Sequence, residues 1–142
     1  MQLTRSERYL QILLRVTALV MLTAIVAVYM PRSWMAYVHE RIGLGEFPSA
    51  VIAEYLARQT SFLYATLGGL FLLAAADVRR YEHLITYLAI ALIINAITTF
   101  LFFMHGLPWY GLAGDLISAA GFVAITLALQ HRARRERSGI QQ

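Results

Sequence analysis

The sequence contains no cysteine and no lysine, and charged residues of any kind are scarce. Without a thiol the chain forms no disulfide, offers no thiolate nucleophile and supplies no cysteine ligand to an iron–sulfur cluster. Only 14% of the 142 residues are charged and 59% are hydrophobic, whereas a soluble domain averages about 25% charged residues. The composition therefore excludes thiol redox chemistry and indicates a membrane protein.

The basic residues are all arginine, and the formal net charge is +4. The densest basic run, from His131 to Arg137, contains no aromatic residue that could stack on bases, so we expect no nucleic-acid partner. Because this run directly follows an apolar segment, we interpret it as a signal for membrane orientation. Contact with the head groups of anionic lipids is the alternative interpretation.

Four apolar runs predict the fold class. They cover residues 9–30, 60–76, 84–104 and 110–129, and a bilayer core of about 30 Å requires roughly 20 helical residues. Pro48 and Ser49 fit a helix start, so the second helix is expected to begin near residue 49. We predict an all-α integral membrane protein, with one four-helix transmembrane bundle over residues 1–142.

A cleaved signal peptide is the alternative for the first run, because Arg5 and Arg8 precede it. However, Pro31-Arg32-Ser33 is a poor small-residue cleavage site. We therefore expect a retained span.

Arginines are distributed unequally between the two sides of the predicted bundle. Eight of them fall on one side: Arg5, Arg8, Arg79, Arg80, Arg132, Arg134, Arg135 and Arg137. The positive-inside rule then places both termini in the cytoplasm. We expect a multi-pass protein of the bacterial cytoplasmic (inner) membrane.

The connection between the first two runs is expected to carry a short interfacial helix outside the cytoplasm. Ser33 can cap this helix, Trp34 and Tyr37 give it aromatic contacts, and Gly43 and Gly45 end it. We expect it to lie flat in the head-group region.

Few polar residues interrupt the apolar runs near the expected outer surface. They are Glu54, Arg58, Asn95, Thr98, His105 and Asp115. A lone charge in hydrocarbon is costly and normally faces a partner or the bundle interior. Glu54 and Arg58 are four residues apart and can pair, and an ion pair between Arg58 and Asp115 would be the most economical arrangement of the charges. Gly68 and Gly69 would let a neighbouring helix approach closely.

Three interpretations of this polar cluster remain open. It can be a structural clamp between helices, a site for a lipid, ion or quinone-like ligand, or a catalytic site that uses His105 and Asp115. No nucleophile is identified, so no catalytic residue is assigned. The segment from His39 to Gly43 starts like a zinc-protease helix but lacks the second histidine, and we expect no metal and no cofactor.

Arg15 is the only charge within the first run. Its long side chain can extend to the cytoplasmic interface. Pairing with Asp77 or Glu82 is the alternative.

Several residues resemble those of the DoxX-like and related uncharacterised families of small four-span bacterial membrane proteins. These are Arg58 at the head of a span with Tyr64 and Gly68-Gly69, the segment from His105 to Pro108, and Asp115 at the start of the fourth span. The resemblance covers roughly residues 9–130. It implies a membrane subunit, which in some members of the group is associated with sulfur-compound or quinone redox systems. This chain lacks cysteine and evident cofactor ligands, which argues against an independent redox role.

Together these features predict a non-enzymatic membrane protein that acts as a subunit or binds a lipid or quinone-like ligand. A small oligomeric transporter or channel is the first alternative, and a membrane enzyme acting at the outer face is the second. The expected partners are membrane lipids and either further copies of the chain or a larger membrane complex.

Overall fold

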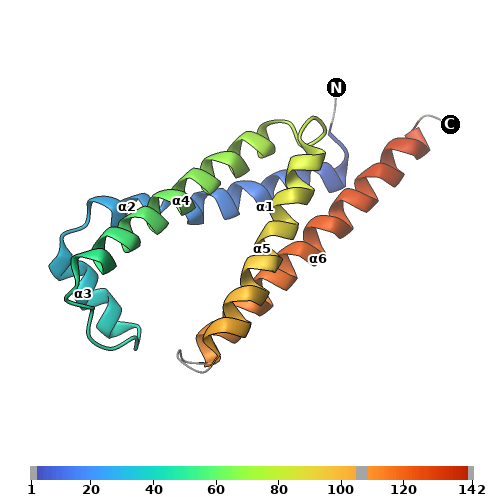
Figure 1. Cartoon of the computed structure of the whole chain (residues 1–142). Helices are drawn as coiled ribbons and strands as arrows, with labels where there is room; N and C mark the ends of the chain where they lie inside the picture. Colours follow the sequence, from blue (N-terminus) through green and yellow to red (C-terminus); the bar gives the residue numbers. More distant parts are fainter. Residues whose placement is uncertain (1–2, 105–108, 141–142) are drawn as a thin grey trace. The chain divides into compact units, whose positions relative to one another are not determined.

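The computed structural model describes residues 3–104 and 109–140. Within these residues the chain is helical and contains no strand (Figure 1). The helices are α1 (Arg5–Leu22), α2 (Ile25–Tyr29), α3 (Arg32–Arg41), α4 (Val51–Ala76), α5 (Glu82–Phe103) and α6 (Trp109–Ile140). The prediction of an all-α chain is confirmed for this part of the sequence.

Four helical stretches are long and apolar enough to cross a membrane. They are Arg5–Tyr29, Val51–Ala76, Glu82–Phe103 and Trp109–Gly139. The shortest has 22 residues, which exceeds the roughly 20 that a bilayer core requires. Each contains one of the four predicted apolar runs or nearly all of it. Helix α6 continues through the arginine-rich run because arginine, glutamate and glutamine are good helix formers.

The first of these stretches is broken between α1 and α2, which the sequence did not predict. The Thr23 hydroxyl donates a hydrogen bond of 2.6 Å to the carbonyl of Val20. The backbone N–H groups of Ala24, Val26 and Ala27 each bond to a carbonyl three residues earlier. This is the tighter 3₁₀ pattern, and a threonine that bonds back to its own helix favours such a bend.

Helix α3 occupies the position predicted for the short helix of the first connection. The proposed cap is wrong, because α3 begins at Arg32 with Pro31 at the N-cap and no side-chain cap bond, so Ser33 lies inside the first turn. Gly43 and Gly45 follow the helix with φ of 83° and 81°. These left-handed conformations suit glycine and end the helix as predicted.

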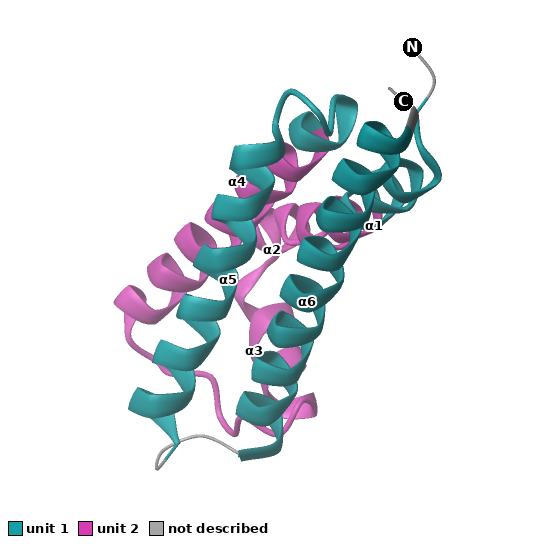
Figure 2. Cartoon of the chain, turned by 90° about the vertical axis from the view of Figure 1, so that its right-hand side faces the viewer, with its two compact units in different colours: residues 1–15, 73–142 teal, residues 16–72 magenta. Residues whose placement is uncertain are grey.

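The chain divides into two compact units, which are described separately (Figure 2). Unit 1 comprises residues 1–15 and 73–142. In it α5 and α6 pack side by side, and α5 buries Ile85, Leu88, Ala89 and Ala96. The start of α1 buries Leu10 and Leu14 on one helical face.

Unit 2 comprises residues 16–72. In it α1 and α4 approach closely at Gly68, because a Cβ atom added to Gly68 would lie 2.9 Å from the carbonyl oxygen of Ala18. A Cβ atom on Gly69 would meet nothing within 4 Å. The predicted close approach therefore depends on Gly68, and Gly69 takes no part in it.

Candidate functional site

The predicted pair of Glu54 and Arg58 is present in unit 2, in the first turns of α4. The Nε and Nη2 atoms of Arg58 donate to Oε1 of Glu54 at 3.1 and 2.7 Å. Arg58 also donates to the backbone carbonyls of Val28 and Met30, the latter at 3.0 Å. Arg58 therefore connects α4 to the C-terminal end of α2, where the last carbonyls of a helix lack partners within it.

The predicted ion pair between Arg58 and Asp115 stays a prediction. Arg58 belongs to unit 2 and Asp115 to unit 1, and each unit is described by itself. Asp115 is exposed on α6, and its backbone carbonyl accepts a hydrogen bond of 2.9 Å from Ser118. A guanidinium has five N–H groups, and four of those of Arg58 are already bonded to Glu54, Val28 and Met30. The predicted site residue His105 lies outside the described residues.

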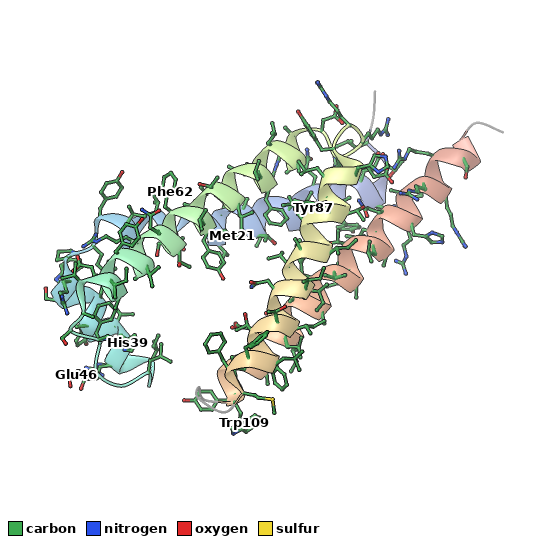
Figure 3. The ribbon with its side chains drawn as sticks, viewed as in Figure 1. Met21, His39, Glu46, Phe62, Tyr87 and Trp109 are labelled. Atoms are coloured by element: carbon green, nitrogen blue, oxygen red, sulfur yellow. The ribbon has the colours of Figure 1, made fainter. Side chains whose placement is uncertain are left out.

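Asn95 and Thr98 lie together on α5, where they line a shallow groove in unit 1. The groove measures about 390 Å³ and is lined by Tyr87, Ile90, Ala91, Ile94, Asn95 and Thr98. We call it the α5 groove. Tyr87, which is 67% exposed, marks one end (Figure 3). The amide and hydroxyl are thus presented among apolar side chains on a helix that is apolar enough to cross a membrane.

A second polar cluster, which the sequence did not reveal, lies in unit 1 around the start of α1. Glu7 is 1% exposed, and its carboxylate accepts hydrogen bonds of 2.5 and 2.6 Å from Nε and Nη2 of Arg79. Arg137 lies 3.3 Å from Glu7 and 3.4 Å from Glu82, and Arg134 pairs with Glu82. We call these five residues the Glu7–Glu82 network.

This network joins three segments that are far apart in the sequence: the start of α1, the α4–α5 turn with the first residue of α5, and the end of α6. Hydrogen bonding to the Glu7 carboxylate raises the pKa of the Arg79 guanidinium above its ordinary value. The neighbouring α1–α6 contact is also polar, because the Ser6 hydroxyl donates to Glu136 at 2.6 Å. The side chains of Arg79, Arg137 and Glu136 are thereby fixed to α1.

Uncharged polar groups add to the contact between α5 and α6. The Gln130 amide, which is buried, donates to the Glu82 carbonyl at 3.0 Å. The Thr86 hydroxyl lies 3.1 Å from the Gln130 side-chain oxygen. These bonds hold the N-terminal end of α5 against α6.

One sequence signal could have revealed the network. Glu7 shares a helical face with Leu10 and Leu14, and a carboxylate at the end of a buried stripe needs a cationic partner. The sequence alone explains the arginines that satisfy it by membrane orientation or by contact with anionic lipids. The predicted alternative for Arg15 is not observed, because Glu82 pairs with Arg134 and Arg137, and the Asp77 side chain accepts the backbone N–H groups of Arg79 and Arg80.

The carboxylates of the two polar clusters are engaged in ion pairs. Glu7, Glu54 and Glu82 are each held by arginines. Among the described residues, no group of three or more histidine, aspartate or glutamate side chains could hold a metal ion.

Comparison with known proteins found no matching family, no matching curated protein and no matching solved structure. The resemblance to the DoxX-like families therefore stays a prediction, and function has to be argued from geometry.

Proposed function

We propose that the protein is a non-enzymatic membrane protein that binds the polar part of a lipid or quinone-like ligand in the α5 groove. The observation that carries this proposal is the exposure of Asn95 and Thr98 in an apolar groove of a helix that is long enough to cross a bilayer. In hydrocarbon an amide or hydroxyl without a hydrogen-bond partner is costly. A bound ligand with a carbonyl or hydroxyl group supplies that partner.

The dimensions of the α5 groove fit an amphipathic molecule. From Tyr87 to Thr98 a helix rises roughly 16 Å, which is about half of a bilayer core of about 30 Å. Asn95 and Thr98 would bond to the polar part of the ligand, and Ile90, Ala91 and Ile94 would contact its apolar part. Tyr87 would pack against the far end of the ligand.

The membrane setting is part of the same proposal. Both termini would face the cytoplasm of a bacterial inner membrane, because eight arginines lie on that side. Tyr29, Trp34, Trp109 and Tyr110 are all more than half exposed, which supports their assignment to an aromatic belt at the opposite interface. Helix α3 would then lie in the outer head-group region. A role as a membrane subunit related to the DoxX-like group would be consistent with this topology.

Native mass spectrometry of the protein in detergent tests the binding proposal, with lipid extracts and a short-chain quinone as probes. We expect the Asn95→Leu, Thr98→Val double variant to bind about thirtyfold more weakly, because it loses two hydrogen bonds of about 1 kcal/mol each. Ile97→Leu is the matched control, since Ile97 is exposed on α5 and does not line the groove.

Equal binding by the double variant and the control would mean that the ligand does not bind in the α5 groove. A change of oligomeric state without any bound ligand would instead identify this face of α5 as an interface between copies, because asparagine and threonine also bond across membrane helices.

A further inference from the structure

The end of unit 1 that carries the Glu7–Glu82 network also carries the entire net charge of the protein. Its eight arginines, which are those of the predicted cytoplasmic side, face four carboxylates: Glu7, Asp77, Glu82 and Glu136. This leaves four positive charges, equal to the formal net charge of +4 for the whole chain. In the remainder of the sequence, acidic and basic residues cancel.

All four of these carboxylates are already engaged within unit 1. Glu7 and Glu82 bind Arg79, Arg134 and Arg137. Glu136 accepts the hydroxyl and the backbone N–H of Ser6. Asp77 accepts two backbone N–H groups of the turn that follows it. Among the described residues, the remaining arginines therefore have no free carboxylate side chain at this end to pair with.

Those remaining arginines are exposed and do not belong to the network. They are Arg5, Arg8, Arg80, Arg132 and Arg135. In the part of the chain that the structure describes, none of the five forms an ion pair. Arg132 and Arg135 are three residues apart on α6 and share a face, as do Arg5 and Arg8 on α1. Arg134 and Arg137 point from α6 toward Glu82.

We propose that these five exposed arginines form a binding surface for the phosphate groups of anionic phospholipids. The surface lies at the ends of helices that are apolar enough to cross a membrane, so the inference rests on the proposed insertion into a bilayer but not on a ligand in the α5 groove. A guanidinium binds phosphate oxygens with two parallel hydrogen bonds. Arg80 lies over the ring of Tyr81, 5.6 Å from its centroid, which orients its charge.

Folding separates the arginines of this end into paired and exposed ones, and only the exposed ones are available to lipids. Orientation during insertion requires only positive charge near the helix ends. In the folded unit, the network pairs three arginines with two carboxylates and leaves the other five exposed, where anionic lipid is the counter-ion that a membrane supplies. The surface is therefore expected to select anionic over neutral lipid after folding is complete.

Spin-labelled lipids test the proposal with the full chain in phosphatidylcholine vesicles. We expect labelled phosphatidylglycerol to associate with the protein more strongly than labelled phosphatidylcholine does, and high salt to weaken this preference. Arg132→Gln should lower the preference by up to fivefold and the Arg132→Gln, Arg135→Gln double variant further. Arg132→Lys should retain only part of it, because the charge is kept but the two parallel hydrogen bonds of a guanidinium are lost.

Arg41→Gln is the matched control, since Arg41 is exposed on α3 in unit 2 and its loss removes the same charge. If Arg41→Gln lowers the preference as much as Arg132→Gln does, only net charge matters and the proposed surface is wrong. Equal association of both lipids with the native protein would also overturn it. Ligand retention in the α5 groove should be unchanged in all these variants, so the two proposals can fail independently.

Discussion

The Glu7 carboxylate and the Arg79 guanidinium form two hydrogen bonds, of 2.5 and 2.6 Å, across 72 positions of sequence. Glu7 is 1% exposed, whereas the Arg79 side chain is 22% exposed. A two-bond pair fixes both the distance and the angle between its partners. The start of α1 is therefore held to the turn between α4 and α5 by a contact that no hydrophobic pair could orient as strictly.

Glu7→Gln is expected to lower the free energy of unfolding by about 3 kcal/mol, because it leaves Arg79 and Arg137 without their shared carboxylate. Unfolding in mixed micelles with increasing sodium dodecyl sulfate measures this change. The matched control is Glu40→Gln, at an exposed carboxylate of α3, which should change the stability by less than about 0.5 kcal/mol. A similar loss in both variants would contradict a specific role for Glu7.

The sequence predicted the helices well because each has a local cause. The local causes are apolar runs of sufficient length, Pro48 before α4, and Gly43 and Gly45 after α3. The helices begin and end close to the positions that these residues predict. The pair of Glu54 and Arg58 was predictable for the same reason, since four residues along a helix bring two side chains together. The break at Thr23 was missed because threonine occurs in many unbroken helices.

The Glu7–Glu82 network could not be predicted because its geometry is not local. Any of eight arginines on the same side could have paired with Glu7, and only the folded arrangement of unit 1 selects Arg79 and Arg137. The predicted outer cluster around Arg58 and Asp115 also depends on non-local geometry. An ion pair between Arg58 and Asp115 depends on helix placement that periodicity does not determine, so it stays a prediction.

Replacement of Gly68 by alanine is expected to destabilise the protein by about 1–3 kcal/mol. The new Cβ atom would lie 2.9 Å from the Ala18 backbone carbonyl, which cannot move aside as a flexible side chain can. Gly69→Ala is the control and should be neutral or stabilising, because its Cβ atom meets nothing within 4 Å and alanine is the better helix former. Thermal unfolding in detergent compares the two, and equal midpoints would argue against close packing at Gly68.

Arg58→Lys tests whether Arg58 acts through its shape as well as its charge. Lysine keeps the charge but cannot bond at once to Glu54 and to the carbonyls of Val28 and Met30. We expect faster hydrogen exchange of the amides in α2 and a loss of about 1 kcal/mol in stability. Arg41→Lys on α3 is the control and should leave exchange in α2 unchanged. Native exchange rates in Arg58→Lys would mean that its contacts with the two carbonyls contribute little.

Two threonines of unit 1 should respond in opposite ways to replacement by valine. The Thr126 hydroxyl is fully buried and has no hydrogen-bond partner in the described structure, so Thr126→Val should be neutral or stabilising by up to about 1 kcal/mol. Thr86→Val should instead be destabilising by about 1 kcal/mol, because it leaves the side-chain oxygen of buried Gln130 without the Thr86 hydroxyl. Chemical unfolding of both variants decides the matter, and the reverse order would place a partner beside Thr126.

The proposed topology predicts which connections reach the periplasm of a bacterial cell. Alkaline phosphatase folds to an active form only outside the cytoplasm, so a fusion after Gly45 should be active and a fusion after Arg80 inactive. The physical reason is the charge distribution, since Arg79 and Arg80 favour retention of the turn between α4 and α5 on the cytoplasmic side. Substituting both arginines by glutamine should weaken this retention and raise the activity of the second fusion. An inactive first fusion with an active second one would reverse the orientation and place the exposed arginines of unit 1 on the outer surface.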